Sequence, residues 1–414
     1  MSKKEEKAEK AAAKLLVTDI AELAKQIEDI GKQLDNPPVN LDRANYVTGT
    51  VSFGSLCLDV VTGGGLPPGK ITDILGGEGS GKSTAVGHVM SSAIKENIPI
   101  LYYDHEAGAD GMYLGALGVK IRLASGKKNP YFNYFQPTTG ESTYRHINRI
   151  LDLLPDYTHS DEGRPLPVTI FIIDSIAAMM PESQQNDDES NQMAASARVH
   201  SYGLRMIKSK LGRKNCSLLV TNQQREKPGV SYGSPLYEVG GAALKYYPDL
   251  KIRFSAVGKD WLERNRQFKK MNVKTMKNKQ FVPFLELEEK IALCFGKGFE
   301  RGYDGLGYLE ITNQIVKKGG WYTIATPTYE ALNGQKVQHD ALMQICCSNE
   351  FRSFARNQIN SGDAFKLYFQ SMDWEKMYSV DEEDSGVDLN KLMSEQEEVI
   401  DQEINETNLV SITP

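Results

Sequence analysis

Apolar residues in the first three quarters of the chain gather in short runs separated by longer amphipathic stretches. Four such runs are ITDIL (71–75), IPILYYD (98–104), VTIFIID (168–174) and CSLLVTN (216–222). Short apolar runs without alternation are typical of strands buried on both faces of a parallel sheet. Helical stretches follow the first two runs and separate the third from the fourth, so residues 51–300 predict an α/β fold. We expect two later strands in KIRFSAV (251–257) and FVPFLELEE (281–289).

A helical stripe precedes this region. Its apolar positions recur in steps of four and three, at Leu16, Ile20, Leu23, Ile27, Ile30 and Leu34. Asp19 and Glu22 are spaced like a capping box, and Asn36-Pro37-Pro38 is a stop signal. Six stripe positions are enough for a short coiled coil, but we favour a helix that docks on a core or on a neighbouring subunit.

The pattern changes again towards the C-terminus. Residues 302–375 include Gly319-Gly320-Trp321 and a mixed helical ending, which predict a small second domain. From about residue 376 aromatic residues become scarce and acidic residues abundant, a composition typical of disorder. We therefore divide the chain into an N-terminal oligomerisation helix and linker (1–48), a core (49–300), a small α+β C-terminal domain (301–375) and an acidic disordered tail (376–414).

The net charge of −6 conceals an asymmetry. Residues 381–406 hold eleven acidic residues against the single base Lys391, a charge of −10, so residues 1–380 carry +4. A basic body with an acidic tail is common in nucleic-acid-binding proteins. A tail that only improves solubility explains the composition equally well.

Several classes of protein are disfavoured. No apolar run approaches the ~20 residues that span a bilayer, and the charged N-terminus lacks a signal-peptide core, so we expect no membrane partner. The five cysteines show neither CxxC nor zinc-ligand spacing. We expect a reducing cytoplasm.

The strongest chemical signal is the run Gly76, Gly77, Glu78, Gly79, Ser80, Gly81, Lys82 and Ser83, which fits GxxxxGK(S/T) and is followed by Thr84. It directly follows a predicted strand and opens a helical stretch, the context that this P-loop requires. Backbone N–H groups of such a loop cradle phosphates at a helix N-terminus. We expect Lys82 to contact the β- and γ-phosphates of ATP and Ser83 to ligate Mg²⁺.

Two carboxylates are candidates for the same site. Asp174 ends a buried strand, where a P-loop protein places the carboxylate that holds Mg²⁺. Taken alone, an aspartate there is usually a cap or a turn. Glu106 follows the strand that ends at Asp104 and is a candidate base for the attacking water, although a lone loop glutamate is normally solvated surface.

Further segments resemble the RecA recombinases, the family of bacterial RecA and phage UvsX. The resembling segments are 52–84, YYDHEAGAD (102–110), QPTTGEST (136–143), IIDSIAAMMP (172–181), TNQQREKPGVSYGSP (221–235), GGAALKYYPDLKIRF (240–254), MKNKQFVPF (276–284) and KKGGWYTI (317–324). They lie in family order. The resemblance implies a RecA-like P-loop ATPase core with a mostly parallel sheet, ATP and Mg²⁺ as cofactors, and a DNA-dependent ATPase activity.

The family's nucleotide residues transfer to matching positions. Glu106 matches the glutamate that activates water, and Asp110 and Tyr113 match residues that contact adenine. Gln223 matches the glutamine that senses the γ-phosphate. Lys277 and Lys279 match lysines that reach the γ-phosphate of a neighbouring subunit, a role in which lysine is a weaker version of an arginine finger.

The resemblance also implies two DNA-binding loops. Residues 224–240 resemble the second, for which we name Arg225, Lys227, Gly229, Tyr232, Gly240 and the adjoining Gly241. Residues 182–193 resemble the first but are acidic, so we expect its DNA contacts from Arg198 and Arg205 on the following helix. The basic, aromatic-containing stretch 259–274 fits a DNA-lining segment and a solvated hairpin equally well.

Together these features predict a DNA recombinase. It would form a homo-oligomeric helical filament on single-stranded DNA and pair it with homologous duplex DNA, assisted by loader and single-strand-binding proteins. A hexameric helicase of the same superfamily would share the P-loop and Asp174. A non-catalytic DNA-binding mediator would need none of Lys82, Ser83, Asp174, Glu106 and Gln223, so the intact set disfavours it.

Overall fold

The computed structural model describes residues 49–157, 165–186, 192–226, 236–238, 241, 243–263, 266–327, 329–330 and 332–370. By its internal contacts the chain divides into Met1–Phe369 and Gln370–Pro414. The predicted N-terminal helix and acidic tail lie outside the described residues. All five cysteines are described, and their thiols are free. No helix within these ranges is long and apolar enough to span a bilayer.

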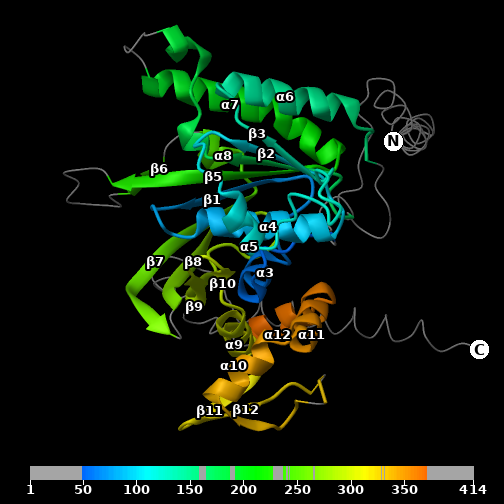
Figure 1. Ribbon diagram of the computed structural model, residues 1–414, viewed down its shortest axis with the longest axis vertical. Helices are drawn as coiled ribbons and strands as arrows, with labels where there is room; N and C mark the ends of the chain where they lie inside the picture. The colour runs from blue at the N-terminus through cyan, green and yellow to red at the C-terminus, as the bar shows by residue number, and fades with distance from the viewer. Residues whose placement is uncertain are drawn as a thin grey trace, which may run out of the picture. The chain divides into compact units, whose positions relative to one another are not determined.

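A large, mostly parallel sheet forms the centre of the first unit (Figure 1). Six parallel strands lie in the order β7 (Leu250–Glu263), β1 (Ile71–Gly76), β5 (Ser217–Glu226), β4 (Ile170–Asp174), β2 (Ile100–Asp104) and β3 (Phe132–Phe135). Beyond β7 the sheet continues antiparallel through β8 (Arg266–Asn278), β9 (Glu286–Cys294) and β10 (Gly298–Phe299). The mixed α/β fold and the four central strands are confirmed.

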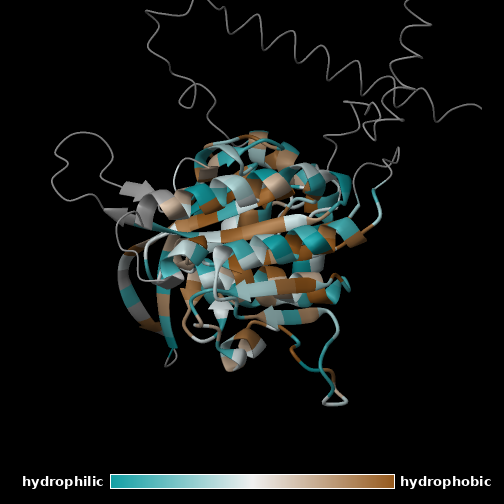
Figure 2. Cartoon of the chain, turned by 90° about the horizontal axis from the view of Figure 1, so that it is seen from above, coloured by the Kyte–Doolittle hydropathy of each residue, from teal (hydrophilic) through white to brown (hydrophobic). Residues whose placement is uncertain are grey.

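Helices cover both faces of the sheet (Figure 1). The pair α6 (Gly140–Leu153) and α7 (Gln192–Arg213) packs on one face, where Ile147, Leu204 and Ile207 are fully buried. The other face carries α3 (Leu56–Thr62), α4 (Lys82–Lys95) and α5 (Gly111–Ala116). Figure 2 shows the apolar residues concentrated in the strands between these layers. Each buried aliphatic side chain contributes about 1.5–3 kcal/mol.

The last predicted strand begins later than expected. The prediction began it at Phe281, whereas β9 begins at Glu286. Pro283 has no N–H to donate to a ladder, and Phe284 has a φ of 65°, a conformation incompatible with a strand. Phe281 instead packs against Phe365 and Phe369, with ring centroids 5.0 and 5.2 Å from its own and the rings tilted.

Strand β3 was not predicted, and for the stretch that supplies most of β8 a hairpin was one of two predictions. Most of β8 comes from the basic stretch 259–274, which pairs with β7 as an antiparallel hairpin and aligns Trp261 with Phe268. The backbone of this stretch is therefore a hairpin, and a contact with DNA stays a prediction.

The remaining helices and strands extend this framework. Short elements near the DNA-loop segments are two 3-10 turns, η1 (Ile176–Ala178) and η2 (Glu182–Asn186), with β6 (Leu236–Glu238) and α8 (Ala243–Tyr246). The C-terminal part comprises α9 (Arg301–Ile311), β11 (Ile315–Lys318), β12 (Trp321–Ile324), β13 (Lys336–Gln338), α10 (His339–Cys347), α11 (Asn349–Asn360) and α12 (Asp363–Gln370). Strands β11, β12 and β13 form a small antiparallel sheet.

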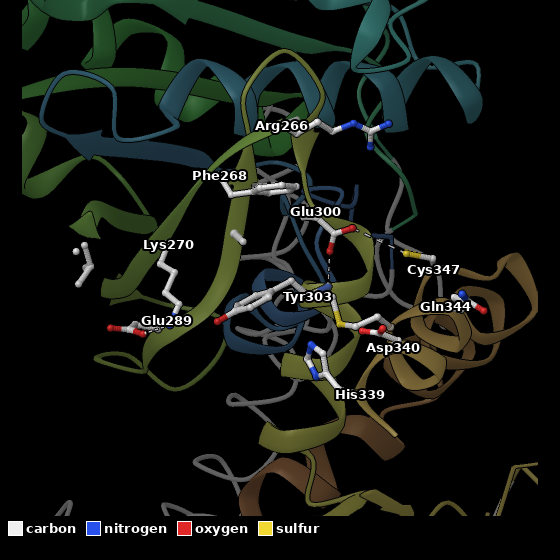
Figure 3. A pocket seen from close by; sticks show the side chains of 14 residues that line it. Arg266, Phe268, Lys270, Glu289, Glu300, Tyr303, His339, Asp340, Gln344 and Cys347 are labelled. Atoms are coloured by element: carbon white, nitrogen blue, oxygen red, sulfur yellow. Dashed lines mark hydrogen bonds and ion pairs between the residues drawn. The ribbon is translucent and has the colours of Figure 1, made fainter. Parts of the chain in front are cut away.

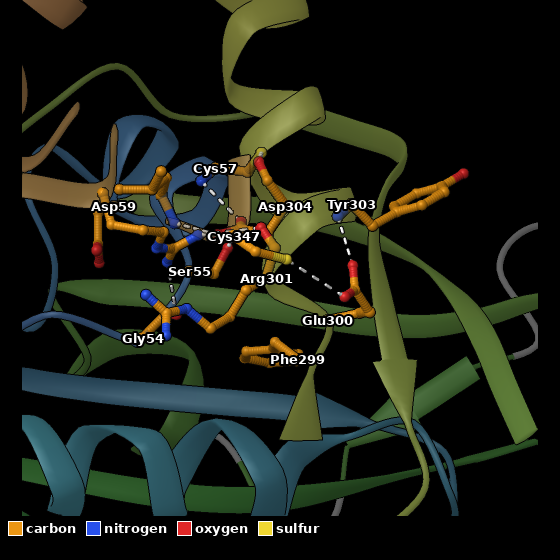
Figure 4. A network of polar contacts seen from close by, with 12 residues as sticks. Gly54, Ser55, Cys57, Asp59, Phe299, Glu300, Arg301, Tyr303, Asp304 and Cys347 are labelled. Carbon is orange, nitrogen blue, oxygen red and sulfur yellow. Dashed lines mark hydrogen bonds and ion pairs between the residues drawn. The ribbon is translucent and has the colours of Figure 1, made fainter. Parts of the chain in front are cut away.

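A buried carboxylate joins this C-terminal part to the core (Figure 4). Asp304 on α9 accepts hydrogen bonds from the Ser55 hydroxyl (2.5 Å) and from the backbone N–H groups of Leu56 (2.9 Å) and Cys57 (3.2 Å). It therefore satisfies the free N–H groups at the start of α3. Arg352 on α11 donates to the same carboxylate at 2.7 Å. The division at residue 301 remains a prediction, and the residues on its two sides share this network.

Candidate functional site

The P-loop connects β1 to α4. Gly79 and Gly81 have φ values of 65° and 85°, which glycine adopts without strain. A side chain at Gly77 or Gly79 would meet nothing within 4 Å, so both positions face open space. The ammonium of Lys82 donates to the carbonyls of Gly76 (3.0 Å) and Gly77 (2.6 Å).

The P-loop holds a partly buried cation near two carboxylates. Burial lowers the pKa of Lys82, and the carboxylates of Glu106 and Asp174 oppose that shift. These opposing carboxylates place negative charge near the ammonium. The Ser80 hydroxyl is buried in the loop without a hydrogen-bond partner, and Ser83 at the start of α4 is exposed. The P-loop, the Lys82 ammonium and the hydroxyls of Ser80 and Ser83 therefore fit a nucleoside triphosphate.

Strand register brings the predicted residues to one edge of the sheet. Gly76 at the end of β1 aligns with Gln223 on β5, and Asp104 at the end of β2 aligns with Asp174 on β4. Because these strands are parallel neighbours, their carboxyl ends share one edge, where ligands bind in open α/β sheets.

Asp174 is held in place by two neighbouring strands. The hydroxyl of Thr221 on β5 donates to its carboxylate at 2.5 Å, and that of Tyr102 on β2 donates at 3.1 Å. Burial raises the pKa of Asp174, while the hydrogen bond from Thr221 acts in the opposite direction. Within the described residues no three potential metal-binding side chains cluster. A magnesium ion held by Ser83 and Asp174 would therefore rely on phosphate oxygens and water as well, as Mg²⁺ usually does.

Glu106 lies in the loop after β2, with its side chain exposed. Its Oε1 accepts hydrogen bonds from the Ser175 hydroxyl and from the Gln223 amide, the latter at 3.1 Å. Asp104 fixes the loop by accepting from the N–H groups of Glu106 (3.1 Å) and Ala109 (3.0 Å). The structure thus brings Glu106 and Gln223 into direct contact.

Two predicted adenine contacts lie on α5. Asp110 is exposed and caps this helix, accepting from the N–H of Met112 at 2.8 Å. The Tyr113 hydroxyl lies 2.6 Å from the hydroxyl of Thr84 in the P-loop helix. Burial raises the pKa of the Tyr113 hydroxyl. The nearby thiol of Cys294, at the end of β9, raises it by a smaller amount.

The two predicted trans-acting lysines lie elsewhere. Lys277 on β8 aligns with Lys251 on β7. Close by, Asp249 accepts a hydrogen bond from the N–H of Ile71, the first residue of β1, whereas the P-loop follows the last. The Lys277 ammonium donates to the carbonyls of Lys245 (3.3 Å) and Tyr246 (2.9 Å), and Lys279 lies 3.8 Å from Asp249. Burial, reinforced by the Lys279 charge, lowers the pKa of Lys277. The structure does not bring these lysines to the P-loop of their own chain.

The predicted DNA-binding residues are partly described. Arg198 and Arg205 are exposed on α7, seven residues and therefore about 10 Å apart on one side of the helix. Gly241 lies against this helix, because a side chain there would come within 2.9 Å of Ala197. The side chain of Arg225, and all of Lys227, Gly229, Tyr232 and Gly240, lie outside the described residues.

Several supporting residues were not predicted. They are Tyr102, Asp104, Ser175 and Thr221, each of which donates to or orders Asp174 or Glu106. Polar residues inside or directly after apolar strand segments are the sequence signal that points to such roles.

A separate cavity of about 830 Å³ lies between the β8–β9 hairpin and helices α9 and α10 (Figure 3). Phe268, Tyr303 and Met343 give it apolar walls, and Lys270 forms an ion pair with Glu289 at its side. Its described lining includes none of the nucleotide-site residues.

A P-loop between a parallel strand and a helix, with an aspartate two strands away along the same sheet edge, defines a P-loop nucleotide-binding protein of the α/β class. The family model described as "RecA N-terminal domain" matches residues 21–300. Protein RecA of Nostoc is 33% identical over 316 residues, 75% of this chain and 80% of that protein. The Rippkaea orientalis protein is 34% identical over 286 residues (68% and 75%), and the Trichodesmium erythraeum protein 33% over 321 (75% and 79%). The chain belongs to the RecA family, the DNA recombinases.

Proposed function

We propose that this chain is a DNA-dependent ATPase that forms a helical filament on single-stranded DNA and pairs it with homologous duplex DNA. The observation that carries the proposal is that the P-loop follows the last residue of β1, whereas Lys279 lies beside Asp249, which accepts a hydrogen bond from the N–H of the first residue, Ile71. A chain whose own lysines lie away from its P-loop needs a neighbour to complete the site. A head-to-tail filament supplies that neighbour, since each subunit offers both ends.

The proposed roles combine the geometry of this site with the family resemblance. Backbone N–H groups of residues 76–81 and the Lys82 ammonium would hold ATP, and Ser83 and Asp174 would hold Mg²⁺. The ion would neutralise charge that develops on the transferred phosphoryl group. Glu106 would accept a proton from the attacking water, and Lys277 and Lys279 of the adjacent subunit would stabilise the developing charge.

DNA would bind at two elements next to the carboxyl edge of the sheet, helix α7 and the end of strand β5. Arg198 and Arg205 present positive charge to phosphates, and β5 leads from Gln223 directly into the predicted second DNA loop. Because Gln223 contacts Glu106, a displacement of that loop would alter the position of the base. The proposal includes loader and single-strand-binding proteins as partners in the bacterial or phage-infected cytoplasm.

Electron microscopy of the full chain with single-stranded DNA and a non-hydrolysable ATP analogue, alongside ATP hydrolysis with and without DNA, tests the proposal. Helical filaments and hydrolysis that depends on DNA are the expected results. Closed rings with directional unwinding would instead support a helicase. DNA binding without any hydrolysis would support a mediator.

A further inference from the structure

Glu106 has a neighbour whose side chain the proposed chemistry does not use. His105 is half-buried, and its backbone N–H donates to the backbone carbonyl of Asp174 at 2.7 Å. Its imidazole Nε2 lies 3.0 Å from the hydroxyl of Thr143 on α6. The His105 ring therefore has a hydrogen-bond partner on α6 while its backbone is tied to β4.

Helix α6 also contacts α7. Tyr144, next to Thr143, places its hydroxyl 3.2 Å from Nδ1 of the fully buried His200 on α7. The other imidazole nitrogen of His200 lies 3.1 Å from the hydroxyl of Ser196. His200 therefore has a hydrogen-bond partner on both sides, one of which belongs to the neighbouring helix.

Close packing reinforces this link. A side chain at Gly203 would come within 2.3 Å of the Tyr144 ring, and one at Gly140 within 3.0 Å of Val199. The two helices therefore approach each other at glycines, and a shift of α7 along its axis would push directly on Tyr144. Packed interfaces of this kind change between discrete arrangements rather than deforming continuously.

We propose that His105 is a positioning residue that links helix α7, through Tyr144 and Thr143, to the catalytic carboxylate of Glu106. Helix α7 carries Arg198 and Arg205, so DNA that draws these arginines towards its phosphates moves the helix that contacts Tyr144. Glu106 then receives two inputs from DNA. One arrives through Gln223 and the strand that leads to the second loop, and the other through α7, α6 and His105.

This inference rests on the proposed function, since it assigns His105 a part in DNA-stimulated ATP hydrolysis. A purely structural role for the same contacts makes a different prediction. It would lower hydrolysis equally with and without DNA, or lower only the melting temperature.

The test compares His105→Ala and Tyr144→Phe in the full chain. Tyr144→Phe removes only the hydroxyl and keeps the ring that packs on Gly203. The measured quantities are kcat and KM for ATP, without DNA and with saturating single-stranded DNA, and the melting temperature. In each variant we expect the stimulation of kcat by DNA to fall about five-fold, the effect of one hydrogen bond. KM for ATP and the turnover without DNA should stay unchanged. Since both residues act along one route, the double variant should lose no more than the larger single loss.

His146→Ala is the matched control. His146 also lies on α6 and its Nδ1 lies 3.2 Å from a tyrosine hydroxyl, but that tyrosine is Tyr103 on β2 rather than a residue that faces α7. It should keep full stimulation by DNA. Full stimulation in both test variants, equal losses with and without DNA, or losses that multiply in the double variant would each overturn the proposal. If the unaltered chain hydrolyses no ATP with DNA, the proposed function itself fails and this inference falls with it.

Discussion

The side-chain amide of Gln223 donates to the carboxylate of Glu106 at 3.1 Å. The accepting oxygen is Oε1, which also accepts the hydroxyl of Ser175. Two donors on one oxygen hold that carboxylate group in one orientation. A movement of Gln223 would remove one of these donors and so change how the Glu106 side chain is held.

Exchange of Glu106 for glutamine should separate binding from hydrolysis. Glu106→Gln keeps the size of the side chain but cannot accept the proton of water, so phosphate release should fall by at least 100-fold, the usual contribution of a general base. ATP and DNA affinity should persist. Lys82→Ala, by contrast, should lose nucleotide binding too. Nucleotide affinity and phosphate release measure both effects, and normal turnover in Glu106→Gln would place the base elsewhere.

Mixing two inactive variants tests the shared site. Subunits with Lys277→Ala and Lys279→Ala keep an intact Glu106 face, and Glu106→Gln subunits keep an intact lysine face. Each variant alone should be inactive, whereas mixed filaments should recover part of the ATPase activity where intact faces meet. Filaments that form from the mixture without any recovery would show that the lysines act within their own chain or not at all.

Acid should weaken the fold through His200. Burial lowers its pKa from 6.5 to about 4, so between these values the unfolded chain binds a proton that the folded chain does not. The contribution of neutral His200 to stability is therefore complete above pH 6.5 and is lost as the pH falls towards 4. At pH 5 the loss is about 2 kcal/mol. Melting temperatures from pH 7.5 to 4.5 should fall more steeply for the unaltered chain than for His200→Leu. The exposed His339 provides a control, since His339→Leu should leave the slope unchanged.

Loss of Arg352 should destabilise the join between the C-terminal part and the core. Its partner Asp304 is 1% exposed in its side chain, and a buried carboxylate deprived of its cation costs about 3–5 kcal/mol. Arg352→Ala should therefore lower the melting temperature by several degrees. Arg301 is exposed and bonds only to Asn349 among the described contacts of its guanidinium, so Arg301→Ala should have little effect. Equal melting temperatures would contradict the assigned role of Arg352.

Deletion of residues 381–414 tests the acidic tail. A segment of charge −10 beside a body of +4 can compete with DNA phosphates for the basic surface. The truncated chain should bind duplex DNA more tightly at low salt and show a steeper salt dependence. The difference should shrink as the Debye length falls from ~10 Å at 0.1 M to ~3 Å at 1 M. ATPase activity at saturating single-stranded DNA should barely change. Equal affinity at every salt concentration would leave the tail a solubilising or partner-docking segment.

The central strands were predictable because they are buried on both faces and therefore read as continuous apolar runs. The alternation of β8 is hard to recognise in the sequence because its buried positions are not evenly spaced: Phe268 and Met271 are three residues apart, and so are Thr275 and Asn278. The predicted strand began too early, at Phe281, because this apolar side chain packs against α12 and is not part of a strand.

The residues of the candidate site were likewise only partly predictable from the sequence. Local motifs pointed to Lys82, Asp174 and Glu106. Thr221 and Tyr102 could not be assigned to Asp174, because their contacts exist only once the order β5–β4–β2 is known. Sequence spacing says nothing about which strands become neighbours.

Strand β5 does not stop at the sheet edge but continues past Gln223 to Glu226, where it pairs with β6. Glu226 lies opposite Leu236, so the nine intervening residues begin and end about one strand spacing, ~5 Å, apart. Folding therefore fixes the separation of Glu226 and Leu236. A ligand that binds beside this strand pair does not have to bring these two positions together, so that entropic cost is absent from the free energy of binding.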